Sequence, residues 1–157
     1  MSEPLIIETS PQGVTTLTLN QPDRHNALSQ EMIDALFEAL TNLKQQPVSR
    51  VLVLAANGKS FCSGADLAEM RTMAQVDEQA NRDQAIELAT LMHNLYYSPI
   101  PSIARVNVPA FVGALGLIAC CDFDVASKEV NFAFTELQLG LVPAVISPYI
   151  INAMGPR

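Results

Sequence analysis

The chain has 157 residues, 49% of them hydrophobic, which is the size of a single domain with a substantial buried core. A net charge of −7 argues against nucleic acid or an anionic membrane as a partner, because either would repel an acidic protein. No uninterrupted apolar run is long enough to span a membrane, and residues 1–8 lack the basic start and apolar stretch of a secretory signal.

The three cysteines, Cys62, Cys120 and Cys121, do not follow a metal-ligand spacing. Their number is odd, and adjacent residues such as Cys120 and Cys121 are poorly placed to form a disulfide bond. We therefore predict no metal site, a reducing cytoplasmic location, and cysteines that pack as small apolar side chains.

Two strands and a helix are predicted at the amino-terminal end. Leu5–Thr9 and Val14–Leu19 flank a turn signal, and the second segment alternates polar and apolar side chains. After a polar loop, Ser29 has the character of a helix N-cap, and Pro47 is expected to end the helix. The predicted inner face of this helix consists of Met32, Ile33, Leu36, Phe37, Leu40 and Leu43.

The next predicted strand, Val51–Ala55, is continuously apolar, which is typical of a parallel strand covered on both faces. A glycine-bearing loop follows, and Asp66 at its end could cap a helix that begins at Leu67. The polar stretch 72–82 separates this helix from another one. The inner face predicted for that second helix consists of Ile86, Leu88, Leu91, Met92 and Leu95.

A second glycine-bearing loop follows the predicted strand Ile103–Val106. It leads into an almost wholly apolar helical segment, 114–121, whose first turn carries Gly113 and Gly116. The first N–H groups of a helix lack intrahelical partners and point in the same direction as the helix dipole. This segment therefore predicts a site for negative charge at the beginning of the helix.

Two further strands, 123–126 and 130–134, complete the predicted element order ββαβαβαββ. Phe132, Phe134 and Glu136 share the parity of a strand, so we expect the carboxyl group to end an apolar face. A carboxyl group placed there could accept or donate a proton beside the helix.

Two loops of the same design can direct their N–H groups at one atom. Such a pair of donors is an oxyanion hole, which stabilises the negative charge that develops on a carbonyl oxygen. If that carbonyl belongs to a thioester, the negatively charged intermediate is an enolate. Glu136 would then handle the proton or the water at the adjacent carbons.

These segments resemble the enoyl-CoA hydratase/isomerase, or crotonase, superfamily. The resemblance is carried by LNQPDRHNAL at 19–28, SFCSGADL at 60–67 and the stretch from Ile103 to Pro143, which together span nearly the whole chain. It implies an α/β fold, a crotonase-like spiral of ββα units that forms one core domain over residues 1–157. It also implies an acyl-CoA thioester as ligand, no separate cofactor because coenzyme A is part of the substrate, and a homo-oligomer, either a trimer or a dimer of trimers.

The resemblance also implies roles for individual residues. The backbone N–H groups of Ala65 and Gly113 would form the oxyanion hole, and Glu136 matches one of two catalytic glutamates. Arg24 lies where basic residues often meet the phosphates of coenzyme A. The other residues assigned to substrate binding are Ser63, Gly64, Asp66, Gly116 and Pro143. For Asp66 a helix cap, and for Gly116 tight helix packing, are the favoured alternatives.

Three features depart from the family pattern. Gly116 stands at the position of the second hydratase glutamate and cannot transfer protons. Val108 and Val112 stand where relatives usually have glycine, so the loop is expected to be strained or its entrance narrowed. The family's carboxyl-terminal helical region is absent, and the chain is expected to be truncated after the start of a helix near 147–153.

The sequence is therefore interpreted as a hydratase that adds water to an α,β-unsaturated acyl-CoA thioester. The run FAFTELQLGLVPAVISPY resembles the branch that acts on methylglutaconyl-CoA and related branched acyl-CoAs, for example in leucine degradation. Two alternatives remain open. One is an enoyl-CoA double-bond isomerase that uses one glutamate, and the other is a catalytically silent fragment or interaction subunit.

Overall fold

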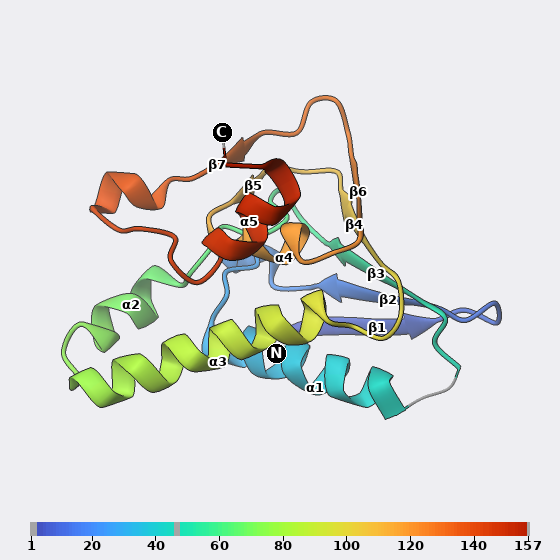
Figure 1. The fold of residues 1–157 in the computed structure, drawn as a ribbon, viewed down its shortest axis with the longest axis horizontal. Coiled ribbons are helices and arrows are strands. Elements are labelled where there is room, and N and C mark those ends of the chain that lie inside the picture. The colour runs from blue at the N-terminus through green and yellow to red at the C-terminus, as the bar shows by residue number, and fades with distance from the viewer. Residues whose placement is uncertain (1–2, 46–47, 157) are drawn as a thin grey trace.

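The structure is a computed structural model that describes residues 3–45 and 48–156. Five strands form the main sheet in the order β1-β2-β3-β4-β6, and β5 pairs with β7 (Figure 1). The strands are β1 (Leu5–Thr9), β2 (Val14–Leu19), β3 (Val51–Ala56), β4 (Ser102–Val106), β5 (Ala110–Phe111), β6 (Phe123–Ala126) and β7 (Phe132–Ala133). The helices are α1 (Gln30–Gln45), α2 (Leu67–Met73), α3 (Glu78–Tyr96), α4 (Gly113–Ala119) and α5 (Ser147–Met154), with short 3₁₀ helices η1 (Pro22–Arg24) and η2 (Glu136–Leu139).

Strand pairing brings the ends of β2, β3 and β4 to one edge of the main sheet. β1 and β2 are antiparallel, with Leu5 opposite Leu19, as the predicted hairpin requires. β2, β3 and β4 are parallel neighbours, with Leu17 opposite Leu54 and Leu54 opposite Ala104. Because the carboxyl ends of parallel strands meet at the same edge, the loops that follow these strands begin close together.

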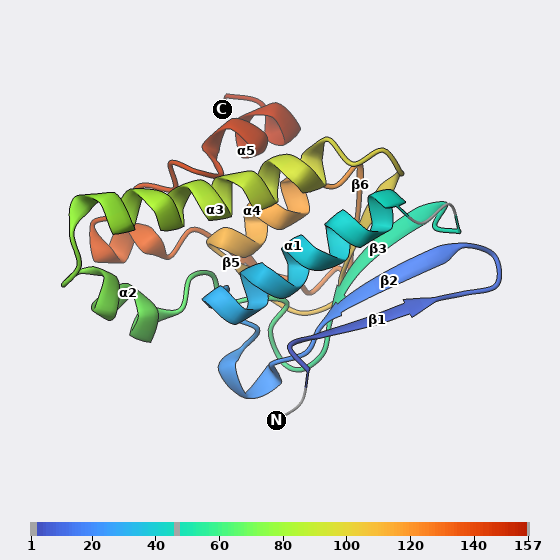
Figure 2. The same ribbon diagram turned by 90° about the horizontal axis from the view of Figure 1, so that it is seen from below.

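The hydrophobic core is built from the main sheet and the helices α1, α3 and α4. Figure 2 shows α1 and α3 side by side. Their buried residues include Met32, Ile33, Leu36, Leu40, Leu43, Leu91, Met92 and Leu95. At the beginning of α1, the N–H of Met32 donates to Oγ of Ser29 (3.4 Å), as expected for an N-cap. Pro47, which was expected to end this helix, lies outside the described residues.

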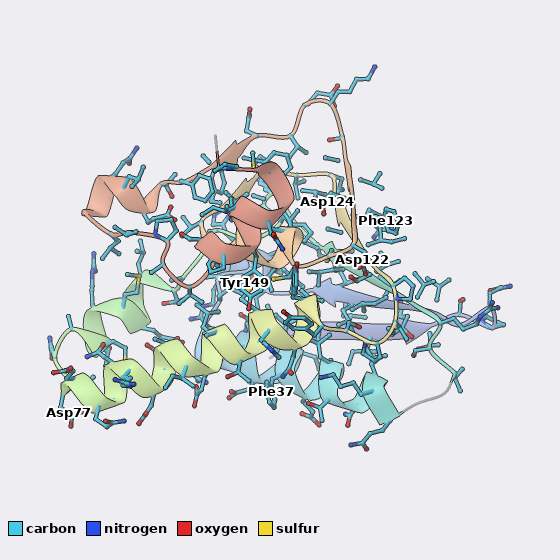
Figure 3. The ribbon with its side chains drawn as sticks, viewed as in Figure 1. Phe37, Asp77, Asp122, Phe123, Asp124 and Tyr149 are labelled. Carbon is cyan, nitrogen blue, oxygen red and sulfur yellow. The ribbon has the colours of Figure 1, made fainter. Side chains whose placement is uncertain are left out.

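Two apolar side chains assigned to the inner helix faces are exposed instead. Phe37 of α1 is 41% exposed and Ile86 of α3 is 51% exposed, and Figure 3 shows Phe37 on the outer side of α1. In α3, the buried residues lie only in the second half, because the first half extends beyond α1 (Figure 2). Among the helices of the described ranges, none is both long and apolar enough to cross a membrane.

The strand β3 is parallel to its neighbours, as predicted, but it is not covered equally on both faces. Leu52 and Leu54 are fully buried against the helices, whereas Val51 and Val53, which point to the other face, are half-buried. Within the described residues, the helices therefore cover one face more completely than the other.

The predicted strand 130–134 is shorter than expected, and Glu136 does not lie on it. Only Phe132–Ala133 pairs, because its partner β5 is also two residues long and turns into α4 immediately afterwards. Glu136 instead opens η2 and is buried, while Phe132 is 49% exposed and Phe134 is 37% exposed. The burial of Glu136 was foreseen, but it comes from the turn into η2 rather than from strand parity.

The last helix, α5, was predicted near 147–153 and packs against α3 and α4. The rings of Tyr96 and Tyr149 lie 5.1 Å apart, and Nδ2 of Asn152 donates to the hydroxyl oxygen of Tyr96 (2.5 Å). Figure 3 shows Tyr149 between α5 and α3. This docking brings Ile146, the residue before α5, into the core.

Candidate active site

Asn26 ties together the loops that follow β2 and β3. It is fully buried, and its backbone lies in the left-handed region with a φ of 51°. Its Nδ2 donates to the carbonyl oxygens of Asn57 (2.8 Å) and Ser60 (2.9 Å). Buried polar groups are stable when they are paired, so Asn26 holds the beginning of the second loop in place. The sequence analysis assigned no role to Asn26, because nothing in the local pattern distinguishes it from the other polar residues of its loop.

The second loop stays attached to the first one as far as Gly64. The N–H of Ser63 donates to the carbonyl oxygen of His25 (3.0 Å), and the N–H of Leu28 donates to that of Gly64 (2.8 Å). For the N–H of the next residue, Ala65, we find no protein acceptor within the described parts of the chain. This group is therefore available to a ligand.

The third loop, which precedes α4, runs parallel to the second one. The N–H of Phe111 donates to the carbonyl oxygen of Cys62 (3.0 Å), and Cys62 is bridged with Ala110. The two loops are still adjacent three residues further on, because a Cβ on Gly113 would lie 3.8 Å from Cα of Gly64, the residue before Ala65. Gly113 is the first residue of α4, so its N–H has no intrahelical acceptor. The two N–H groups named by the sequence motifs thus belong to neighbouring positions on two adjacent segments.

Glu136 is the buried carboxyl group of the site. It is only 5% exposed, and neither of its oxygens has a hydrogen-bond partner within the described residues. An unpaired buried polar group costs free energy, and such a group in a native protein calls for an explanation such as catalysis or a missing ligand.

A cavity of about 640 Å³ connects these groups. Glu136, Ala65 and Gly113 all line it. Four of the residues assigned to substrate binding also line it, namely Arg24, Ser63, Asp66 and Pro143. Much of the remaining wall is apolar and includes Leu28, Leu67, Met70, Leu88, Leu141, Val142, Val145 and Ile146. A cavity that joins paired N–H donors to one carboxyl group can hold a carbonyl compound with an apolar tail.

Gly64 and Gly116 do not line the cavity, although both were assigned to substrate binding. Gly64 has a φ of 91°, and a Cβ placed on it would lie 2.6 Å from Cβ of Val112. A Cβ on Gly116 would lie 2.8 Å from Cβ of Ile146. Both glycines therefore allow close packing, which was the alternative weighed for Gly116.

A known protein family matches nearly the whole chain. The profile of the family "Enoyl-CoA hydratase/isomerase" matches residues 9–157. The chain belongs to this family.

Solved structures and named relatives support the same assignment. The crystal structure of an enoyl-CoA hydratase from Shewanella pealeana is 43% identical with a TM-score of 0.94, over 98% of this chain and 58% of that one. AtuE of Pseudomonas aeruginosa is 29% identical with a TM-score of 0.92, over 98% of this chain and 59% of that one. The enoyl-CoA isomerase/hydratase fer4 of Mycosarcoma maydis is 35% identical over 83% of this chain and 50% of its own length. The chain thus spans between half and three-fifths of the length of these members of the family.

In this member of the enoyl-CoA hydratase/isomerase family, Arg24 is already paired within the protein. Its Nη2 lies 2.6 Å from Oδ2 of Asp66, and Oδ1 of Asp66 accepts from the N–H groups of Ala68 (2.9 Å) and Glu69 (3.1 Å). The prediction that Asp66 caps a helix is therefore confirmed. Burial raises the pKa of Asp66, but hydrogen bonds from Glu69, Arg24 and Ala68 outweigh this effect and hold the pKa below its ordinary value.

The two valines that depart from the family pattern differ from each other. Val112, which precedes α4, has a φ of 52° and a ψ of −114°, as expected for a position that favours glycine. Val108 is not among the residues with positive φ and packs against the core. Strain is therefore confirmed for Val112 alone, where it costs on the order of 1–3 kcal/mol.

The cysteines are not arranged for nucleophilic catalysis. Burial raises the pKa of Cys62 to about 12, and the same cause raises the pKa of Cys121 to about 12. A thiol with such a pKa is protonated and weakly reactive at neutral pH. Cys62 and Cys120 are buried, as predicted for small apolar side chains. In the parts of the chain that the structure describes, no group of His, Cys, Asp and Glu side chains is arranged to hold a metal ion.

Proposed function

We propose that the chain carries the catalytic groups of an enzyme that adds water to an α,β-unsaturated acyl-CoA thioester. The observation that carries this proposal is the burial of Glu136, without any protein partner, in the same cavity as the N–H groups of Ala65 and Gly113. Coenzyme A is part of the substrate here and not a separate cofactor.

In this mechanism the thioester oxygen accepts hydrogen bonds from the N–H groups of Ala65 and Gly113. The Glu136 carboxylate takes a proton from water while the water oxygen bonds to the β-carbon. The electron pair of the carbon–carbon double bond moves toward the thioester, and the resulting enolate oxygen is stabilised by the two donors. Protonated Glu136 then returns its proton to the α-carbon, which restores the carboxylate and completes the addition of water.

The rim of the cavity offers a contact for the phosphates of coenzyme A. Arg24 lines the cavity, and its side chain is 45% exposed. A phosphate that binds Arg24 must compete with Asp66, which already accepts a hydrogen bond from the guanidinium group. In this proposal Ser63 and Asp66 border the adenine, and Pro143 borders the acyl group.

The wall of the cavity favours an apolar acyl group over an acidic one. Among the described residues that line it, Arg24 is the single Lys or Arg side chain, and it is paired with Asp66. The carboxylate of a methylglutaconyl group would need a cation or several hydrogen-bond donors when it is buried. We therefore place a small apolar enoyl group ahead of methylglutaconyl as the substrate.

A double-bond isomerase is the second candidate, and the packing around Gly116 favours it. Residue 116 is a glycine and Ile146 packs beside it, so α4 supplies no second glutamate at this position. One carboxylate is sufficient to remove a proton at one carbon and return it two carbons away. Incubation of a 3-enoyl-CoA in deuterium oxide distinguishes the two reactions, because only isomerisation yields a conjugated product without adding water.

The experiment that tests the proposal compares Glu136→Gln with Glu129→Gln, which changes an exposed glutamate outside the cavity. Hydration of crotonyl-CoA is followed by the loss of enoyl absorbance, and binding is measured with butyryl-CoA, which cannot react. We expect turnover to fall about 10²–10⁴-fold in Glu136→Gln, with binding nearly unchanged and Glu129→Gln like the wild type. Wild-type turnover in Glu136→Gln would refute the proposal. Binding of butyryl-CoA without any turnover of crotonyl-CoA or a 3-enoyl-CoA by the wild-type chain would support a silent fragment instead.

A further inference from the structure

Val112 lines the cavity with a backbone conformation that is strained for its residue type. It is β-branched, yet its φ of 52° lies in the left-handed region that such residues rarely adopt. Glu136 lines the same cavity. Strain of this kind persists only where the surrounding structure enforces it, and it is found most often at functional sites.

The side chain of Val112 lies directly against Gly64. A Cβ on Gly64 would be 2.6 Å from Cβ of Val112 and 3.2 Å from each of its two methyl carbons. Gly64 precedes Ala65, and Val112 precedes Gly113. The isopropyl group therefore belongs to the residue before Gly113 and lies against the residue before Ala65, and the N–H groups of Gly113 and Ala65 face the thioester oxygen in the proposed reaction.

We propose that Val112 is a specificity-determining residue that disfavours acyl groups branched at the α-carbon. This inference rests on the proposed binding of a thioester at the N–H groups of Ala65 and Gly113. A thioester carbonyl carbon has two substituents, the sulfur and the α-carbon. The sulfur substituent is the same in every coenzyme A thioester. A bulky protein side chain beside the carbonyl group can therefore discriminate between thioesters only through the substituents on their α-carbon.

Two isomeric ligands isolate this effect. Butyryl-CoA and isobutyryl-CoA contain the same atoms and differ in branching at the α-carbon, and neither can undergo hydration. Their dissociation constants are measured by calorimetry for the wild type, Val112→Ala and Val112→Gly. Val108→Ala is the matched control, because Val108 packs against the core and does not line the cavity.

We expect the wild type to prefer butyryl-CoA, and we expect this preference to fall about tenfold in both Val112 variants, since one methyl group in a close-fitting apolar site is worth about that much. Val108→Ala should keep the wild-type preference. Val112→Ala separates bulk from strain, because alanine also disfavours positive φ but lacks the two methyl groups. If only Val112→Gly changed the preference, backbone strain would be the cause and the inference would be wrong.

The failure of this inference differs from the failure of the proposed function. If the wild type bound neither thioester, the proposed function itself would fail. If the wild type bound both thioesters and the ratio of their dissociation constants were the same in Val112→Ala, the proposed function would survive, and Val112 would have no part in specificity.

Discussion

Ile146 occupies the space in which a side chain at Gly116 would have to lie. A Cβ on Gly116 would come within 2.8 Å of Cβ of Ile146 and 3.2 Å of Cε of Met92. All three residues are buried. The position that resembles the second glutamate of hydratases is thus a contact between α4 and the segment that leads into α5.

The first prediction concerns this contact. Gly116→Ala should destabilise the chain by about 1–3 kcal/mol. The added methyl group overpacks the core, and the cost of this overpacking exceeds the stability gained from the higher helix propensity of alanine. Ile146→Ala should also destabilise it, by about 2–5 kcal/mol, because it leaves a cavity. The double variant should lose less stability than the sum of the single losses, since the alanine at 116 fills part of that cavity. Urea unfolding of the four proteins checks this, and additive losses would mean that the two sites do not share the space.

The second prediction compares the two valines as backbone positions. Val112→Gly removes the strain of a β-branched residue at positive φ. Val108→Gly removes no such strain, because Val108 does not have a positive φ, and it also removes core packing. Both substitutions loosen the unfolded chain equally, so this effect cancels in the comparison. We expect Val112→Gly to be more stable than Val108→Gly by about 1–3 kcal/mol. Equal unfolding midpoints in urea would show that the backbone at Val112 is not strained.

The third prediction concerns pH. The pKa of Asp66 is below its ordinary value in the folded chain, so its contribution to stability is fully present above the unfolded pKa of about 3.9. This contribution is lost as the pH falls through the lower folded value. The wild type should therefore be more stable than Asp66→Asn at pH 6, and the difference should shrink below about pH 4. Urea midpoints of both proteins across this range are the measurement, and a gap that widened in acid would contradict the assigned direction.

The fourth prediction concerns the exposed apolar surface. Phe123 and Val125 are 63% and 61% exposed, and Figure 3 shows Phe123 on the outer side of β6. β6 is the last strand of the main sheet, so its outer edge has no partner strand within the described residues. Exposed edges and apolar patches promote association.

We therefore expect light scattering to show self-association that increases with concentration, or fluorescence to show that the monomer binds a hydrophobic dye. Phe123→Lys should weaken either effect, whereas Thr41→Lys, which changes an exposed polar residue on α1, should not. A stable monomer that does not bind the dye at any concentration would show that this surface does not promote association. The trimer or dimer of trimers suggested by the family resemblance stays a prediction.

Much of the local structure could be predicted because it depends on short-range patterns. The bounds of β1, β2 and β6 agree with the predicted segments, since turn signals and strand-like runs need no knowledge of distant residues. The N-cap of Asp66 likewise follows from residue type and position. The exposure of Phe37 did not follow, because burial depends on how far the opposing surface extends.

The sequence by itself determined the family, most of the strands and helices in their order, and the residues that could form an oxyanion hole beside Glu136. It did not predict β5. These conclusions depend on motifs and periodicity, which are local properties of the sequence. Only the tertiary structure decided that Glu136 opens η2, that Gly116 packs against Ile146 and that Val112 lies over Gly64. The contacts of Gly116 with Ile146 and of Val112 with Gly64 join segments that are distant in the chain, so their geometry is set only when the chain folds.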